Sequence, residues 1–144
     1  MIRLATKYDI PELLRMGKEF FDASGYGDIT SFNEEDTTVL INKLIGEGFL
    51  LTDGKTSMLG FVVFPMFMNS SYVVAQELFW WVDKESRSTG IGAEILHEAE
   101  KLAKTHGAES MVMLSINGLN GKKVNKFYEK LGYVKREQSY MRAI

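Results

Sequence analysis

A short glycine-containing segment, Arg87-Ser88-Thr89-Gly90-Ile91-Gly92, carries the clearest chemical signal in the sequence. It lies between an apolar stretch that is typical of a strand and a periodic stretch that is typical of a helix. Glycines let the backbone approach a ligand closely, and the free N–H groups and positive dipole end of a first helical turn favour an anion. Arg87 adds a charge that can contact phosphate oxygens. The segment therefore predicts a phosphate site, although its glycine spacing alone fits an ordinary helix start equally well.

Two familiar phosphate-binding motifs do not fit this loop. A Walker loop requires Lys and then Ser or Thr after its second glycine, where this chain has Ala93-Glu94. A dinucleotide fingerprint requires Gly or Ala at its third position, where Ile95 stands. The sequence therefore favours neither an NTPase nor a dehydrogenase.

The elements that would position the loop follow one another in an irregular order. Strands are predicted over Met1–Thr6, Phe49–Thr52, Met58–Met68, Val73–Val82 and Ser110–Ile116, with a last strand or hairpin over Tyr133–Ile144. Helices are predicted from Ile10 to Phe21, with Asp9 as N-cap and Glu12 at N3, then from Asn33-Glu34 to a stop at Gly46, from Ile91 to an end at His106-Gly107, and over Val124–Leu131. This order predicts an α+β fold with a mixed, mostly antiparallel central sheet flanked by helices. The step from Val73–Val82 through a helix to Ser110–Ile116 is the one predicted parallel crossover.

Bulk properties narrow the classes of protein. At 144 residues, with 45% apolar and 25% charged residues, the chain is expected to form one domain over residues 1–144. A net charge of −2 predicts neither a nucleic-acid nor a membrane partner, and without a signal peptide or membrane span we expect a cytoplasmic protein. The chain has no cysteine, and His97 and His106 lack the spacing of a zinc pair, so neither a cysteine nucleophile nor a metal is expected.

Two segments resemble the signatures of a known family. The run from Glu77 to Gly92 resembles the strand and the Arg/Gln-x-x-Gly-x-Gly/Ala motif of the GNAT superfamily of acetyltransferases. Downstream, Asn125-Lys126-Phe127-Tyr128-Glu129-Lys130-Leu131-Gly132-Tyr133 resembles its second signature, and the opening Ile2–Thr6 with Asp9-Ile10 is similar to the usual start of these domains. The resemblance covers nearly the whole chain. It implies an N-acetyltransferase that uses acetyl-CoA as cosubstrate, with residues 87–92 around the pyrophosphate of coenzyme A.

Two side chains are candidates for the proton transfers of such a reaction. The attacking amine must lose a proton and the departing thiolate must gain one. Glu77 is the only acidic residue within its strand, and regular alternation would put it on one face with Phe79 and Trp81, so it is the candidate base. The resemblance implies that Tyr128 is the general acid. A solvated strand glutamate and a core-edge aromatic are the respective alternatives.

Other residues are implied to contact the cosubstrate. In this family the strand that carries Trp81-Val82 usually bulges, and its backbone pairs with the pantetheine arm as an added strand would. A backbone N–H of the same strand would stabilise the oxyanion. Asn120 is a further candidate, but the family's Asn commonly falls one residue nearer the Tyr, where this chain has Gly121. Asn120 as a simple N-cap is the alternative.

No motif identifies the acceptor. Aromatic residues and carboxylates in the first two predicted helices would suit a cationic amine, but the same residues suit core packing and a helix N-terminus. We therefore expect direct transfer in a ternary complex to a primary amine of a small molecule or a protein, and leave a homodimer open. The alternative is a non-catalytic acyl-CoA binding or regulatory module on the same fold. The segment around Tyr128 disfavours an unrelated phosphate-binding domain.

Overall fold

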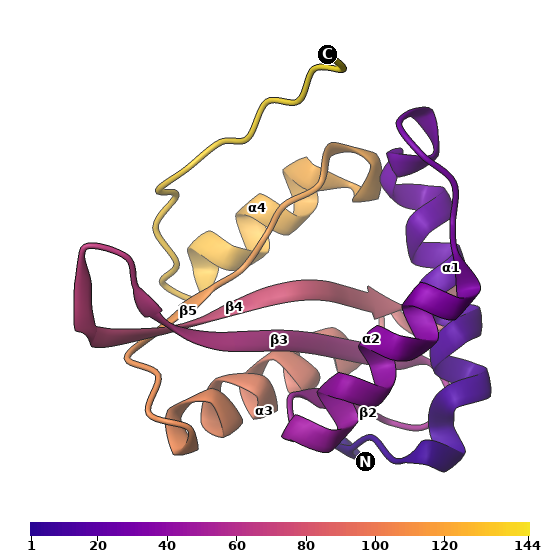
Figure 1. The fold of residues 1–144 in the computed structure, drawn as a ribbon, viewed down its shortest axis with the longest axis horizontal. Coiled ribbons are helices and arrows are strands. Elements are labelled where there is room, and N and C mark those ends of the chain that lie inside the picture. Colours follow the sequence, from indigo (N-terminus) through magenta and orange to yellow (C-terminus); the bar gives the residue numbers. More distant parts are fainter.

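The computed structural model, which describes residues 1–144, is a five-stranded sheet with helices on both faces (Figure 1). The strands are β1 (Arg3–Leu4), β2 (Leu50–Thr52), β3 (Ser57–Met66), β4 (Asn69–Val82) and β5 (Ser110–Val112), and they neighbour one another in sequence order. The helices are α1 (Ile10–Ser24), α2 (Glu34–Glu47), α3 (Ile91–Thr105) and α4 (Gly121–Lys130), with 3-10 turns η1 (Lys7–Asp9), η2 (Tyr26–Asp28), η3 (Lys84–Ser86) and η4 (Asn117–Leu119). Strands β1 to β4 are antiparallel and β5 is parallel to β4, which confirms the predicted α+β class and crossover.

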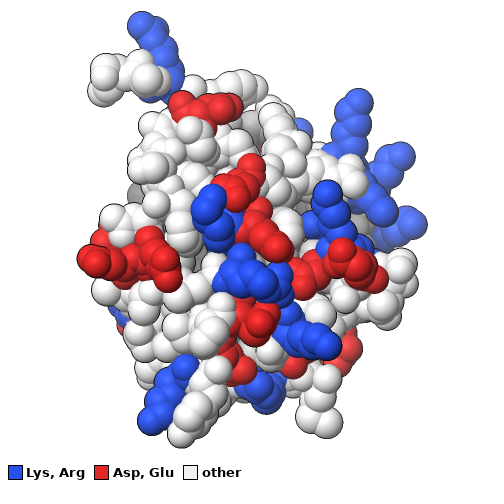
Figure 2. All heavy atoms as spheres, turned by 90° about the vertical axis from the view of Figure 1, so that its right-hand side faces the viewer, with Lys and Arg blue, Asp and Glu red and all other residues white.

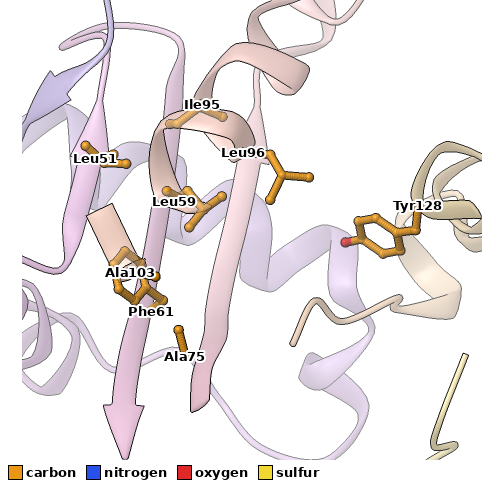
Figure 3. Packing of buried hydrophobic residues seen from close by; sticks show 9 residues of the cluster. Leu51, Leu59, Phe61, Ala75, Ile95, Leu96, Ala103 and Tyr128 are labelled. Atoms are coloured by element: carbon orange, nitrogen blue, oxygen red, sulfur yellow. The ribbon is translucent and has the colours of Figure 1, made fainter. Parts of the chain in front are cut away.

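Each face of the sheet has its own core. On one face, buried side chains of β2, β3 and β4 pack against α3 and against Tyr128 of α4, whose hydroxyl end points toward the cluster (Figure 3). On the other face, buried side chains of β2, β3 and β4 pack against α1 and α2. Helices α3 and α4 therefore share one face and α1 and α2 the other. No helix combines the length and apolar character that crossing a bilayer requires.

A bulge in β4 changes which of its side chains share a face. Phe79 pairs with Gly60 and Glu77 pairs with Phe61, so Leu78 is an extra residue on β4. Directly paired residues share a face, which places Glu77 with Phe61 on the α3 side, whereas Phe79 packs in the α1–α2 core. The predicted alternation, with Glu77, Phe79 and Trp81 on one face, is wrong because of this bulge. The bulge itself is the feature that the family resemblance implied.

Strands β4 and β5 are paired over a short stretch only. The parallel pairs are Val74 with Ser110, Ala75 with Met111 and Gln76 with Val112, and none follows. The predicted strand over Ser110–Ile116 is therefore correct in place but too long. Beyond Gln76, the backbone of β4 forms no further pairs with the segment that follows β5.

One other sequence prediction is wrong, and another holds only in part. Residues Tyr133–Ile144 form no strand or hairpin, and the segment leaves the body as an unpaired chain (Figure 1). Its apolar residues do not alternate regularly, so no register with one buried face is specified. Asp9 occupies the N-cap position of α1 but makes no cap bond, because its carboxylate instead accepts the Thr6 N–H (2.8 Å) and pairs with Arg3 (2.8 Å).

Candidate active site

A cavity of about 290 Å³ lies where β4 and β5 separate. It is lined from both faces of the sheet, by Phe20 of α1 on one side and by Phe127 and Tyr128 of α4 on the other. Of the residues predicted from the sequence, those that line it are Glu77, Trp81, Val82, Arg87, Gly90, Gly92, Asn120 and Tyr128. Ser88, Thr89 and Ile91 belong to the loop but do not line the cavity. Two distant segments of the sequence thus meet at one site.

The glycine loop presents free backbone donors at one end of this cavity. Gly90 is the N-cap of α3 with φ 86°, a left-handed conformation that glycine adopts without strain. The Thr89 hydroxyl donates to the Ser86 carbonyl (2.6 Å), which closes the turn before the helix. The N–H groups of residues 91–93, in the first turn of α3, have no acceptor within the chain. This end of the cavity therefore has the donors and the dipole that an anion requires.

Arg87 is held in place beside these donors. Its Nε donates to the Val82 carbonyl (2.8 Å), and its guanidinium lies 4.9 Å from the centre of the Trp81 ring. The Trp81 indole N–H in turn donates to Asp83 (2.8 Å), which pairs with Arg15 of α1 (2.9 Å). Because only Nε is engaged, the terminal amino groups of Arg87 remain without a protein acceptor. They are available for a phosphate oxygen.

The free edge of β4 faces the gap toward β5. The Asp83 N–H donates to Thr56 on the β3 side, and successive residues of a strand direct their backbone groups to opposite edges. The backbone groups of Trp80 and Val82 therefore point away from β3. The Val82 carbonyl is already taken by Arg87, which leaves the N–H groups of Trp80 and Val82 and the Trp80 carbonyl for an extended ligand.

Glu77 and Tyr128 meet at the backbone of Leu114, on the segment that follows β5. The Leu114 N–H donates to the Glu77 carboxylate (2.7 Å), and the Tyr128 hydroxyl donates to the Leu114 carbonyl (2.7 Å). Both side chains are buried, with exposed fractions of 4% for Glu77 and 7% for Tyr128. A side-chain carboxylate thus links β4 to the chain after β5 just beyond their last backbone pair.

The surroundings of these two groups shift their pKa values. Burial raises the pKa of Glu77 to about 7, and the hydrogen bond from the Leu114 N–H opposes that rise. Burial, the negative charge of Glu77 and Tyr133 together raise the pKa of Tyr128 well above its usual value. Glu77 can therefore exchange a proton near neutral pH, while Tyr128 keeps its own.

Two roles are predicted for Asn120, a contact to the cosubstrate and a simple N-cap. It is the only non-glycine residue with positive φ (60°), and its backbone occupies the N-cap position of α4. Its side chain makes no capping hydrogen bond, so the N-cap alternative is wrong for the side chain. The residue lines the cavity together with Lys123. Its amide is thus placed to contact a ligand.

Several residues of the site could not be identified from the sequence. Leu114 acts through its backbone, so its residue type gives no indication of the role. Phe20 and Leu119 come from distant segments, and only the fold brings them to one cavity. No group of three or more His, Asp or Glu side chains is arranged to hold a metal ion.

Solved structures with the same α+β architecture include acetyltransferases. An aminoglycoside antibiotic 6′-N-acetyltransferase from Acinetobacter haemolyticus is 15% identical, with a TM-score of 0.68 over 100% of this chain and 97% of that one. A ribosomal-protein-alanine N-acetyltransferase from Brucella melitensis is 15% identical, with a TM-score of 0.70 over 100% and 99%. A Bacillus halodurans protein solved as a tetramutant reaches a TM-score of 0.76 at 20% identity over 100% and 99%.

A family model establishes membership. The model described as the acetyltransferase (GNAT) family matches residues 14–133, and the chain belongs to that family. The matched residues include the glycine loop, Glu77 and Tyr128. No curated protein matches the sequence.

Proposed function

We propose that the protein is an acetyl-CoA-dependent N-acetyltransferase that transfers the acetyl group directly to a primary amine within a ternary complex. One observation carries the proposal. A buried carboxylate with a pKa of about 7 and a protonated phenol meet at Leu114, in the same cavity as the glycine loop. A base and an acid beside an anion site are the groups that acyl transfer to an amine requires.

The residues present fit coenzyme A. The free N–H groups at the start of α3 and the terminal amino groups of Arg87 suit a pyrophosphate. Lys123 and Asn120, which also line the cavity, add a positive charge and an amide. The open edge of β4 at Trp80 and Val82 suits the amides of an extended pantetheine arm. When bound, acetyl-CoA supplies the activated acetyl group.

The chain's own residues then handle protons and charge. In its carboxylate form, Glu77 takes the proton of the ammonium, directly or through a water, so that the amine becomes a nucleophile. A backbone N–H of β4 stabilises the negative charge that develops on the carbonyl oxygen. The Tyr128 hydroxyl, which keeps its proton at neutral pH, supplies it to the departing thiolate. Leu114 holds both side chains at the wall of the cavity.

The names of similar structures support an amine acceptor. One neighbour is named for an aminoglycoside and another for a ribosomal-protein alanine. These names belong to proteins that share the fold at low identity, so they indicate the reaction class and leave the acceptor open.

The test is release of free thiol from acetyl-CoA in the presence of a panel of amines. We expect amine-dependent release, and acetyl-CoA binding in the micromolar range by calorimetry. Tyr128→Phe keeps the ring in the core but loses the hydroxyl, and we expect it to lower kcat with little change in acetyl-CoA affinity. The matched control is Tyr140→Phe, a solvent-exposed tyrosine outside the cavity.

Two outcomes contradict the proposal in different ways. Acetyl-CoA binding without thiol release for any amine would instead support a non-catalytic acyl-CoA binding or regulatory module. Absence of acetyl-CoA binding would contradict the proposal that the glycine loop binds the pyrophosphate of coenzyme A.

A further inference from the structure

We infer that the acceptor is a compact primary amine whose remaining body is apolar and carries no second positive charge; this inference rests on the proposed acetyl transfer. It concerns the end of the cavity that α1 and η4 line. Phe20 and Leu119 line the cavity there and pack against the α1–α2 core. Phe20 also packs edge-on against Phe79, with ring centres 6.5 Å apart. Apolar side chains therefore form this end.

The charges that line the cavity match one ammonium and no more. Its charged lining residues are Glu77, Arg87 and Lys123, so Glu77 is the only carboxylate. Arg87 and Lys123 are assigned to the anionic cosubstrate, so neither offers an ammonium a partner. A second ammonium packed against the half-buried side chains of Phe20 and Leu119 would lose part of its hydration without gaining a partner, which is costly. A polyamine or an aminoglycoside is therefore a poor fit.

The carboxylates of α1 and that of Asp83 are already engaged by cations of the chain. Four ion pairs lie on or beside α1: Arg15–Glu12 (2.8 Å), Arg15–Glu19 (3.1 Å), Arg15–Asp83 (2.9 Å) and Lys18–Asp22 (2.5 Å). On the face of the molecule that carries α1 and α2, red and blue side chains interleave near the centre, while a separate red group lies at the left and a blue group at the upper right (Figure 2). The exposed pairs are individually weak, but they neutralise the α1 carboxylates that a polycation would otherwise meet.

The space at this end is small. The turn η4 sits directly against the end of α1, because a Cβ on Gly118 would lie only 2.6 Å from the Ala23 carbonyl oxygen. The whole cavity measures about 290 Å³ and must also take the reactive end of the cosubstrate. Ligand pockets commonly measure roughly 300–1,000 Å³ for a single ligand. The acceptor is therefore compact.

A matched pair of amines tests the inference on the wild-type protein. Pentylamine and cadaverine have the same carbon chain and differ in one terminal ammonium. We expect kcat/KM for thiol release from acetyl-CoA to be at least roughly tenfold higher with pentylamine, because only cadaverine must bury a second charge. A second readout needs no turnover: with coenzyme A present, pentylamine should raise Tm and cadaverine should not.

Variants at the apolar end should reverse this preference. Phe20→Glu on α1 and Leu119→Glu on η4 each place a carboxylate at the end where the second ammonium would lie. We expect either one to raise the cadaverine-to-pentylamine ratio of kcat/KM by roughly tenfold or more. Phe67→Glu is the matched control, because Phe67 is 87% exposed at the β3–β4 hairpin and lies outside the cavity. Unchanged acetyl-CoA affinity shows that a variant is folded.

The outcomes separate this inference from the proposed function. Equal or faster turnover of cadaverine by the wild-type protein overturns the inference and leaves acetyl transfer standing. A carboxylate at either position that leaves the ratio unchanged in a folded variant also overturns it. Thiol release with no amine at all overturns the proposed function, and the inference with it.

Discussion

The two ends of the cavity are built in different ways. The end at the glycine loop comes from one continuous stretch, in which Arg87 bonds to Val82 and Gly90 starts α3. The end at α1 comes from Phe20 and Leu119, which only the folded sheet and helices bring together. Glu77 and Tyr128 lie between them, joined through Leu114. An end built from one continuous segment can keep its shape for a cosubstrate that is always the same. An end built from separate segments can differ when the acceptor differs.

The largest loss of activity is expected from a substitution at Glu77, which lies where the two ends meet. Glu77→Gln keeps the shape of the side chain and can still accept the Leu114 N–H, but it cannot take a proton. We expect kcat/KM for thiol release to fall by roughly 10²–10³, while the calorimetric affinity for acetyl-CoA stays the same.

The pH profile shows whether the loss reflects a base. Only the carboxylate form of Glu77 accepts a proton, and its pKa is about 7. Wild-type kcat/KM should therefore rise about tenfold per pH unit below that value and level off above it. The Gln variant should lack this inflection. If Gln retained full activity, Glu77 would serve only to hold Leu114.

A smaller effect, confined to the loop end, is expected at Arg87. Arg87→Ala removes a guanidinium whose terminal amino groups face no protein acceptor. We expect acetyl-CoA to bind roughly 10- to 100-fold more weakly, since a hydrogen bond to a charged group contributes about 1.5–3 kcal/mol. The KM of the amine should change little.

Lys84→Ala is the matched control for the lost charge. Lys84 is an exposed residue of the preceding turn η3 and does not line the cavity. Its removal should leave acetyl-CoA affinity nearly unchanged. Equal weakening in both variants would attribute the effect to net charge, and would count against a specific contact by Arg87.

The difference between the two ends also explains which parts could be predicted from the sequence. The order of helices and strands as far as α4, the crossover through α3 and the loop before α3 depend on local patterns, and the structure confirms them. Glu77 was selected as the acidic residue of its strand, but its face was predicted wrongly because one extra residue, Leu78, shifts the alternation. No pattern in a single strand reveals such a bulge, since it is defined by the register with β3.

Other parts depend on contacts that a sequence pattern cannot show. The hydrogen bonds from Leu114 use backbone groups, which every residue type carries. The β5 strand ends at Val112 because its neighbour β4 no longer runs beside it, although apolar residues continue to Ile116. The tail after Tyr133 contains strand-forming residues, but no edge pairs with it. In each case the sequence does not show which other segment these residues contact.

The smallest effect is expected at the composite end, from Gly118→Ala. The added Cβ would meet the Ala23 carbonyl oxygen at 2.6 Å, so η4 must move away from α1 and the wall at Leu119 must move with it. We expect the KM of the amine to change by roughly threefold to tenfold, and Tm to fall by several degrees, as for an overpacked site that costs about 1–3 kcal/mol.

Gly46→Ala separates this effect from the general consequence of replacing a glycine. Gly46 lies within α2 with no atom near its added Cβ, so the change should stabilise the helix by up to about 1 kcal/mol and leave both ligands unaffected. The decisive comparison is between ligands in Gly118→Ala. A changed amine KM with constant acetyl-CoA affinity means that the two ends vary independently, because the glycine loop, Arg87 and the open edge of β4 all lie within residues 80–92. Equally weakened binding of the amine and of acetyl-CoA would mean that η4 also supports the cosubstrate, through the adjoining Asn120. The two ends would then be structurally coupled.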